Sequence, residues 1–371
     1  MTFRWDKQTE SGRARNGLMT TPHGEVLTPA FMAVGTRAAV RAVDVDDLAA
    51  VGAEIVLANT YHLMLRPGAE VVRSAGGLHP FWGWDRPILT DSGGYQLFSL
   101  QPTISEDGAG FRSTYDGSSV TLTPEQAVAI QEALGADIAM ALDVCIGLPS
   151  SADLVKAAMD RTLRWAERAL AVRSRNDQAL FGIVQGGSDP VLRATSARLT
   201  AELGFPGFGI GGLAVGEGPE ERASSIDAVV SKLPDDKPRY LMGLGDPEGV
   251  LEAIARGIDL FDCVWPTRLA RHGRVLTDDG DFNLRRAEFA EDLRPLGASC
   301  DCGTCRRHHR SYLRHLLMTG EMSAFRLISI HNLHFTLGLM GRARAAIADG
   351  SFDDLRRDHM ARRLRSSRLD R

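Results

Sequence analysis

Three cysteines lie close together towards the C-terminal end of the sequence, at Cys300, Cys302 and Cys305. Zinc prefers thiolate and imidazole ligands and takes four of them in a structural site, so this spacing supplies three of the four. The chain has five cysteines, an odd total that favours a metal site over a framework of disulfides. A histidine further along the chain is expected to complete the shell. The candidates are His308, His309, His315, His331 and His334.

Spacing narrows the choice of histidine without deciding it. His308 and His309 follow Cys305 so closely that the chain would have to fold back sharply on itself. His331 comes after a stretch long enough for a helix and could return to the cluster, but spacing alone leaves His334 as an alternative. Three cysteines and one histidine would leave no ligand position for water, so the site is expected to be structural.

A second set of residues with chemical potential follows a series of short apolar segments, directly after the point where each segment ends. In a barrel of parallel strands, residues just past the carboxyl ends of the strands line the active face. Three carboxylates and an amide meeting there would form a polar site. These positions are Asn59, Asp91, Asp143, Gln185, Gly212, Gly245 and Asp262.

The apolar segments predict the elements that must position these residues. Near-continuous hydrophobic runs of this length favour parallel strands buried on both faces. Between them, Thr123, Asp189 and Asp246 each precede a proline, which is typical of a capped helix start. The runs span residues 54–59, 87–95, 138–145, 180–187, 207–213, 239–245 and 258–264.

Strands that alternate with helices indicate an α/β fold of about seven or eight βα units. We therefore predict a (β/α)₈ TIM barrel with an inserted C-terminal zinc-binding subdomain. A doubly wound open sheet is the main competitor, but no G-x-G-x-x-G follows the first strand to support it.

The composition is that of an ordinary globular protein, with 44% hydrophobic and 24% charged residues in 371. No apolar run approaches the roughly 18–20 residues that a membrane-spanning helix needs. Residues 1–10 are too polar and mixed in charge for a secretion signal. The protein is therefore expected to be cytoplasmic, without a membrane partner.

Charge is distributed unevenly along the chain although the net charge is only −4. From Val264 to Arg371 the sequence has 20 arginines against 13 acidic residues. Contacts with nucleic-acid phosphates need such a basic region, but a solvated arginine-rich helical surface explains it equally well. We expect a single domain over residues 1–371, containing a zinc-binding subdomain at about 274–340 and mostly helical from Arg310 onwards.

Several segments, taken together and in this order, resemble the bacterial tRNA-guanine transglycosylases. They are FMAVGT, DSGGYQLFSL, IVQGG, GGLAVGEG, YLMGLG, FDCVWPTR-x-AR-x-G and CDCGTC with the later IHNLHF. The resemblance covers nearly the whole chain, from Gly12 to beyond His331. It implies a zinc-containing barrel enzyme of the pentosyltransferase class that works as a homodimer.

The resemblance also implies a reaction. Guanine at the wobble position of tRNAs with a GUN anticodon would be exchanged for 7-aminomethyl-7-deazaguanine, a queuosine precursor. The substrate would be an anticodon loop that contains uridine-guanine-uridine, with the target nucleotide turned out into the pocket. Because the new bond has the configuration of the old one, two displacements through a covalent enzyme–RNA intermediate are expected.

Residue roles follow from the same resemblance. Asp262 matches the nucleophile, and Asp91 matches the general acid/base that gives a proton to one base and accepts one from the next. Asp143 and Gln185 match the groups that hydrogen-bond the edge of the base.

Other matched positions complete the implied site. Gly212 and Leu213 match backbone that reads the far side of the base, and Tyr95 and Met242 match the side chains that sandwich its ring. Ser92 matches a nearby binding position. RNA-binding residues are expected at Arg268, Arg271 and Arg274. The implied ligands of one structural Zn²⁺ per subunit are Cys300, Cys302, Cys305 and His331, which settles the choice of histidine.

The sequence departs from the family pattern beside the implied base pocket. Val144 stands where many members have glutamate, so a carboxylate is missing there, whereas Cys145 and Val215 resemble the bacterial type. Alternatives are a relative that inserts queuine or another deazaguanine into tRNA or DNA, and a non-catalytic RNA-binding subunit. Such a subunit would be expected to lack the nucleophile. A generic barrel glycosidase would not explain the cysteine cluster.

Overall fold

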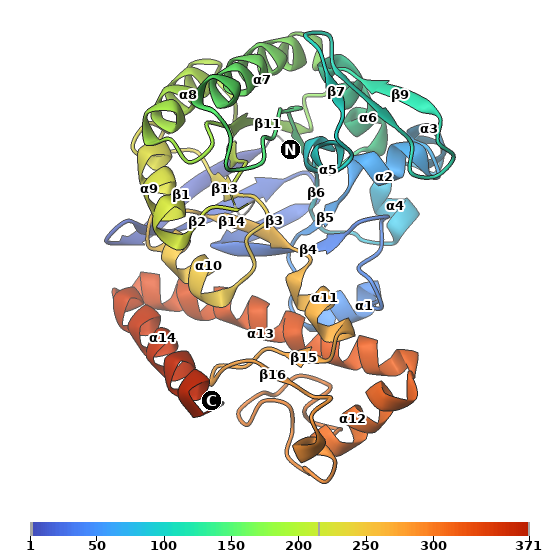
Figure 1. Cartoon of the computed structure of the whole chain (residues 1–371), viewed down its shortest axis with the longest axis vertical. Helices are drawn as coiled ribbons and strands as arrows, with labels where there is room; N and C mark the ends of the chain where they lie inside the picture. Colours follow the sequence, from blue (N-terminus) through green and yellow to red (C-terminus); the bar gives the residue numbers. More distant parts are fainter. Residues whose placement is uncertain (1–2, 214–215, 370–371) are drawn as a thin grey trace.

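Eight parallel strands close into a barrel in the computed structural model, which describes residues 3–213 and 216–369 (Figure 1). The predicted α/β barrel is therefore confirmed. Around the barrel the strands follow the order β4, β5, β6, β10, β11, β12, β13, β14, and β14 pairs with β4 to close the ring. Their bounds are Ala30–Gly35, Val56–Ala58, Ile88–Thr90, Ile138–Met140, Ala179–Val184, Phe208–Ile210, Arg239–Leu241 and Leu260–Cys263.

The seven predicted apolar runs each coincide with one of these strands, and only β11 begins outside its run, by one residue. The eighth, β4, was not among them, although its segment AFMAVG holds the family motif. Ala30, Phe31, Met32 and Ala33 are all buried, as expected for a strand covered on both faces. β4 supplies the pairing partner that both β14 and β5 need.

Helices surround the barrel, and the predicted capping signals are confirmed. Thr123 caps α6 with a reciprocal pair of bonds, since its hydroxyl accepts from Gln126 N (3.2 Å) while the Gln126 side chain accepts from Thr123 N (3.0 Å). Asp189 and Asp246 cap α8 and α10. Helices α1–α11 span Val45–Ala50, Thr60–Leu65, Ala69–Ser74, Leu78–Trp82, Gly94–Ser99, Pro124–Leu134, Ala152–Val172, Pro190–Glu202, Pro219–Val230, Pro247–Ile254 and Trp265–Arg271.

Three small antiparallel sheets of the described residues were not predicted, and one of them is a pair of two-residue strands in the C-terminal part. The first precedes the barrel, and its Trp5 and Met19 pack with barrel residues such as Met140 and Phe181 in one apolar cluster, so this sheet covers the N-terminal end of the barrel. The second lies between β6 and β10. The strands of the first sheet, β1–β3, span Arg4–Ser11, Ala14–Thr21 and Gly24–Thr28, and those of the second, β7–β9, span Thr103–Ile104, Ala109–Arg112 and Ser119–Leu122.

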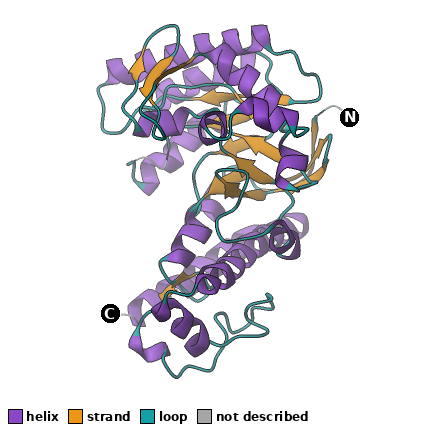
Figure 2. Ribbon diagram, turned by 90° about the vertical axis from the view of Figure 1, so that its right-hand side faces the viewer, coloured by secondary structure: helices purple, strands orange, loops and turns teal. Residues whose placement is uncertain are grey.

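The C-terminal part is mostly helical, as predicted, and lies below the barrel in Figures 1 and 2. Its longest helix, α13, is shared between two cores. Ala324 and Ile328 pack into a cluster of the C-terminal part, whereas Met340 and Ala343 pack against the barrel. The elements are β15 (Arg274–Val275), β16 (Phe282–Asn283), the 3₁₀ helix η1 (Ala287–Phe289), α12 (Arg310–Thr319), α13 (Met322–Asp349) and α14 (Phe352–Leu369). Within the described ranges, no helix combines the length and apolar character that crossing a membrane requires.

A buried carboxylate fastens the N-terminal end of the barrel. Asp137, directly before β10, is bonded by ring nitrogens of His23 (2.8 Å) and His79 (3.1 Å) and by the backbone N–H of Ile88 (2.8 Å). Burial acts to raise the pKa of Asp137, but these hydrogen bonds outweigh it and hold the pKa below its usual value. Asp137 thus joins a turn, α4 and β6 to the start of β10.

We predict that Asp137→Asn lowers the free energy of unfolding by about 2–3 kcal/mol at pH 7, because the amide nitrogen cannot accept the bonds that the carboxylate accepts. Since the folded-state pKa is depressed, the contribution of Asp137 is present above its unfolded pKa and is lost as the pH falls through its folded pKa. Urea unfolding would measure both effects. Asp116→Asn, at an exposed loop, is the control; equal losses in the two variants would contradict the prediction.

Candidate active site and metal centre

The predicted polar residues meet at the carboxyl ends of the barrel strands. Asp91 follows β6, Asp143 lies just past β10 and Gln185 follows β11 directly. Met242 follows β13, and Asp262 lies in β14 itself. Because all eight strands run parallel, these residues share one mouth of the barrel.

Asp91 is held by donors from the neighbouring strand end. Asn59 Nδ2 donates to its Oδ2 at 2.5 Å, and Thr60 N donates to its Oδ1 at 2.9 Å. Burial, together with the negative charge of Asp262, raises the pKa of Asp91 to about 7 even though hydrogen bonds from the backbone of Thr60 and Gly93 and from the Gln96 side chain lower it. Asp91 can therefore exist in both protonation states near neutral pH.

Asp262 receives two hydrogen bonds on one oxygen. Tyr240 Oη donates to Oδ1 at 2.6 Å, and Gly243 N donates to the same atom at 2.8 Å. Burial raises the pKa of Asp262, and it raises that of the Tyr240 hydroxyl, which therefore stays a donor. The negative charge of Asp262 contributes to the raised pKa of Asp91, and both carboxylates stand at the carboxyl ends of barrel strands.

Asp143 forms a separate polar group with two other predicted residues. Gln185 Nε2 donates to its Oδ2 at 2.6 Å, and Ser92 Oγ donates to its Oδ1 at 3.3 Å. All three are buried, and burial raises the pKa of Asp143. These bonds fix the carboxylate in one orientation.

Two glycines leave room for this group. A Cβ at Gly94 would lie 2.3 Å from Asp143 Oδ1, and a Cβ at Gly212 would lie 2.4 Å from Gln185 Oε1. Gly212 also has φ of +65°, a conformation that side chains rarely adopt. Each glycine is therefore needed for the backbone to approach the polar group.

The remaining predicted base contacts differ in exposure. Leu213 is buried and Met242 half-buried, while Tyr95 on α5 is 60% exposed and free to contact a ligand. Val144 packs in an apolar cluster that contains Trp165, so position 144 contributes to the core here. Val215 lies outside the described residues.

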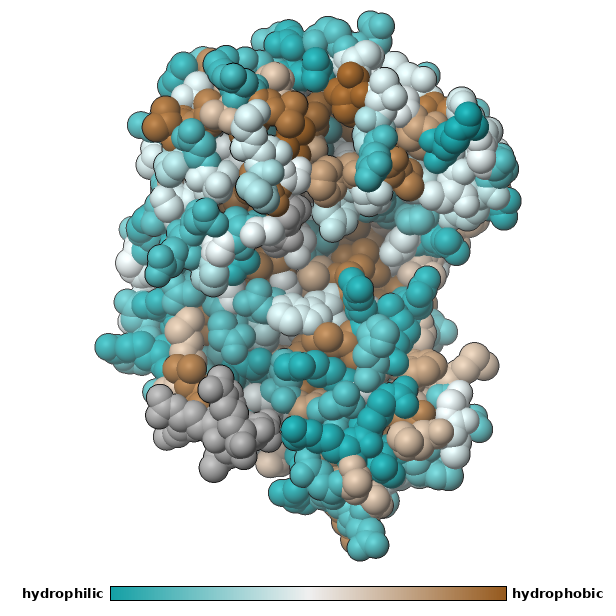
Figure 3. Space-filling model, viewed as in Figure 1, coloured by the Kyte–Doolittle hydropathy of each residue, from teal (hydrophilic) through white to brown (hydrophobic). Residues whose placement is uncertain are grey.

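Arginines follow Asp262 on α11. Arg268 is exposed, and Arg271 is half-buried, with Nη1 donating to Thr267 O at 2.9 Å. Burial and the positive charges of Arg41 and Arg268 lower the pKa of Arg271. Arg274 instead forms an ion pair with Asp281 at 3.5 Å. The visible surface of the C-terminal part is mainly hydrophilic (Figure 3).

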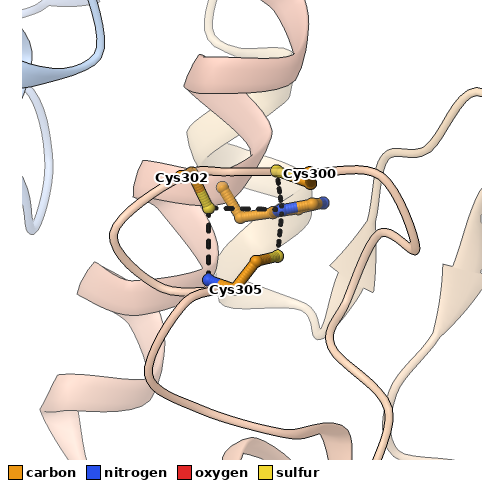
Figure 4. A group of neighbouring side chains, drawn as sticks. Cys300, Cys302 and Cys305 are labelled. Carbon is orange, nitrogen blue, oxygen red and sulfur yellow. Dashed lines mark hydrogen bonds between the residues drawn. The ribbon is translucent and has the colours of Figure 1, made fainter.

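The cysteine cluster meets one histidine (Figure 4). Nδ1 of His331 on α13 lies 3.5, 3.7 and 3.3 Å from the Sγ atoms of Cys300, Cys302 and Cys305. Zinc–sulfur bonds of about 2.3 Å and zinc–nitrogen bonds of about 2.0–2.1 Å in a tetrahedron would place sulfur and nitrogen about 3.5 Å apart. The four side chains therefore fit a tetrahedral metal ion.

Neighbouring bonds select this histidine and orient it. Nε2 of His331 lies 2.9 Å from the carbonyl oxygen of Leu276, which accepts its proton and leaves Nδ1 to face the thiols. His334 instead contacts the exposed Asp301 at 2.9 Å. Asn332, next to His331, donates to the carbonyl oxygen of Pro266 on α11 (3.0 Å) and accepts from Leu276 N (3.0 Å).

Sequence reasoning missed several residues of the mouth. Tyr240 could have been found, because the two-residue period of a strand places it on the same face as Met242. Thr60 and Gly243 act through backbone N–H groups, which leave no trace in the sequence. Arg193 looks like a surface residue of a helix, yet it is fully buried.

Comparisons with known proteins agree with this geometry. The family model described as "Queuine tRNA-ribosyltransferase" matches residues 9–365. A queuine tRNA-ribosyltransferase from Moorella thermoacetica is 52% identical over 364 residues, covering 98% of both chains. One from Desulforamulus reducens is 51% identical over 357 residues, covering 96% of both. One from Thermus thermophilus is 50% identical over 364 residues, covering 98% of this chain and 94% of the relative.

We predict that Asp91→Asn becomes more stable than the unaltered protein as the pH rises. The raised pKa of about 7 means that the folded protein keeps a proton that the unfolded chain loses near pH 4. Stability from this proton is therefore complete below pH 4 and lost as the pH rises through 7. Each pKa unit is worth about 1.4 kcal/mol, and solvent weakens the effect. Between pH 5 and pH 8, the free energy of unfolding of Asp91→Asn should therefore rise by about 2 kcal/mol relative to that of the unaltered protein.

Urea unfolding at the two pH values measures this change, with Asp116→Asn as the exposed control. A difference between Asp91→Asn and the unaltered protein that does not vary with pH would refute the assigned pKa.

For the metal cluster, we predict that Cys302→Ser removes the metal while His334→Ala retains it. A missing thiolate leaves an incomplete shell, whereas His334 faces Asp301 instead. Metal analysis of the purified proteins checks this, and limited proteolysis reports whether the loop around residues 297–305 has loosened. One metal per chain in Cys302→Ser would show that the ligand assignment is wrong.

Proposed function

Because the chain belongs to the queuine tRNA-ribosyltransferase family, we propose that it exchanges guanine for 7-aminomethyl-7-deazaguanine at the wobble position of tRNAs with a GUN anticodon. The observation that carries the proposal is the arrangement of carboxylates in the barrel mouth. Asp91 and Asp262 form an interacting pair, and Asp143 stands apart in a fixed hydrogen-bonded group. Two carboxylates are available for chemistry and a third for recognition.

Asp262 is the proposed nucleophile. Among the described residues, Tyr240 Oη and Gly243 N donate to Asp262, and both reach Oδ1, so we assign attack to Oδ2. Oδ2 would form a bond to C1′ of the ribose while the bond from C1′ to guanine breaks and its electron pair leaves with the base. Tyr240 and Gly243 hold the carboxylate in place for this step.

Asp91 is the proposed general acid/base. A pKa of about 7 is suited to both directions of proton transfer. Its protonated form would give a proton to the departing guanine. The resulting carboxylate would take a proton from the incoming 7-deazaguanine, whose nitrogen then attacks C1′ and releases Asp262. The second displacement restores the original configuration.

Asp143 is proposed to recognise the base edge. Guanine and 7-deazaguanine both present a ring N–H and an amino group there, and a carboxylate offers acceptors to both. Gln185 and Ser92 keep its oxygens oriented. The N–H groups of Gly212 and Leu213 would meet the keto oxygen, with Tyr95 and Met242 on the two faces of the ring.

Contacts with tRNA phosphates are proposed for the arginines that follow Asp262. Arg268 and Arg271 are the stronger candidates because they stand together on α11. Arg274 forms an ion pair with Asp281 in this structure, and this pair would have to break before Arg274 could bind a phosphate.

The cysteine–histidine cluster is proposed to hold one Zn²⁺ per subunit with a structural role. Its donor set of three thiolates and one imidazole suits zinc and leaves no open position for substrate. The ion would fasten the loop that carries Cys300, Cys302 and Cys305 to His331 on α13.

We predict that the protein incorporates radiolabelled guanine into a tRNA transcript with a GUN anticodon, and that Asp262→Asn lowers this rate by about a thousandfold or more. Binding of the tRNA by Asp262→Asn should stay within about threefold, since the phosphate contacts are unchanged. A covalent protein–tRNA adduct on a denaturing gel should form with the unaltered protein and not with the variant.

Controls separate the possible outcomes. Asp246→Asn changes an aspartate at a neighbouring strand end that serves as a helix cap, and asparagine also caps helices, so activity should persist. A transcript with adenine at the first anticodon position should take up no label. Labelling of a DNA strand in place of tRNA, or undiminished exchange by Asp262→Asn, would overturn the proposal. Stronger competition by queuine than by 7-aminomethyl-7-deazaguanine would overturn the choice of incoming base.

A further inference from the structure

Arg193 is a fully buried arginine behind the barrel mouth. It lies in the first turns of α8 and is 0% exposed. Burial lowers the pKa of its guanidinium to about 10, so it keeps its positive charge at neutral pH. A buried charge is unfavourable unless its hydrogen bonds are satisfied, so its partners indicate why it is there.

Those partners are backbone carbonyls of two strand-end loops. Nε donates to Gly187 O at 2.7 Å, and Nη1 donates to Val184 O at 3.1 Å and to Gly211 O at 2.7 Å. Nη2 donates to Gly212 O at 3.2 Å. One guanidinium therefore fastens the loop after β11 to the loop after β12.

Two of these carbonyls belong to the peptide units whose N–H groups the proposed function assigns to the base. The peptide that contains Gly211 C=O also contains Gly212 N–H, and the peptide that contains Gly212 C=O also contains Leu213 N–H. A cation bonded to a carbonyl oxygen polarises the whole peptide, which makes its N–H a stronger donor. It also fixes the direction in which that N–H points.

We propose that Arg193 is a positioning residue that orients and polarises the N–H groups of Gly212 and Leu213 towards the keto oxygen of the purine. The inference rests on the proposed function, because it assumes that a guanine-type base occupies the mouth. It assigns specificity for the 6-keto group to a residue that does not touch the base. Negative charge that builds up on the base as its bond to ribose breaks would be stabilised by the same two donors.

The close packing of this region supports a fixed geometry. A Cβ at Gly186 would lie 2.9 Å from Arg193 N, so the loop after β11 packs directly against the backbone of α8. The planar fork of arginine can reach four carbonyls at once, whereas lysine would place a single ammonium group among them.

The test compares guanine with 6-thioguanine, which keeps the ring N–H and the amino group but replaces the keto oxygen with sulfur, a weak acceptor. Equilibrium binding of both bases is measured for the unaltered protein, Arg193→Met and Arg193→Lys. Arg193→Met should lose about tenfold more affinity for guanine than for 6-thioguanine. The dissociation constant of 6-thioguanine divided by that of guanine should therefore fall about tenfold. For Arg193→Lys, which keeps the charge, this ratio should lie between the values for the unaltered protein and for Arg193→Met.

Arg239→Met is the matched control. Arg239 is also buried and also donates to backbone carbonyls, including Gly257 O at 3.3 Å, but it lies at the start of β13, at the opposite end of the barrel. Arg239→Met should lower thermal stability while leaving the guanine/6-thioguanine ratio unchanged. If Arg193→Met does not fold, Arg193→Lys still reports the change in ratio.

The outcomes are distinct. An unchanged ratio in the Arg193 variants, or an equal change in Arg239→Met, would overturn the inference and leave the proposed function intact. Failure of the unaltered protein to bind guanine would overturn the proposed function and this inference with it.

Discussion

Burying three carboxylates at one end of an apolar barrel is costly, and much of the surrounding structure offsets that cost. An isolated carboxylate in a dry interior is strongly unfavourable unless donors reach it. Asp91, Asp143 and Asp262 each receive at least two such donors from adjacent strand ends. These donors do not fully offset the cost of burying the charge, so the pKa values of all three carboxylates are raised. A carboxylate with a raised pKa is suited to acid/base chemistry.

Buried aspartates at the two ends of the barrel have pKa values that are shifted in opposite directions. At the N-terminal end, hydrogen bonds outweigh burial, and the pKa of Asp137 is lowered. At the C-terminal end, burial outweighs hydrogen bonds, and the pKa of Asp91 is raised. The same residue type thus stabilises the fold in one place and stores unfavourable energy in the other, as is common in barrels of this kind.

The sequence predicted whatever depends on local pattern or on chemically distinctive side chains. Apolar runs, and helix caps such as Thr123 that stand before a proline, predicted the barrel. Aspartates at the ends of those runs predicted the polar residues of its mouth. Strand β4 was missed although its segment is apolar. The small antiparallel sheets were missed because their strands, such as RWDKQTES and ARNGLMTT, have no continuous apolar run. Spacing alone left His331 and His334 as alternatives, because the choice depends on where the Leu276 carbonyl accepts a proton. Arg193 could not be found, because its partners are backbone atoms.

Two neighbouring residues of helix α13, His331 and Asn332, contact different parts of the molecule. His331 faces the cysteines, and Asn332 binds the helix that follows Asp262, while Met340 and Ala343 further along pack on the barrel. An inserted or deleted residue between these points would rotate one half of the helix by about 100° relative to the other. Over evolutionary time, length changes between residues 331 and 343 should therefore be excluded.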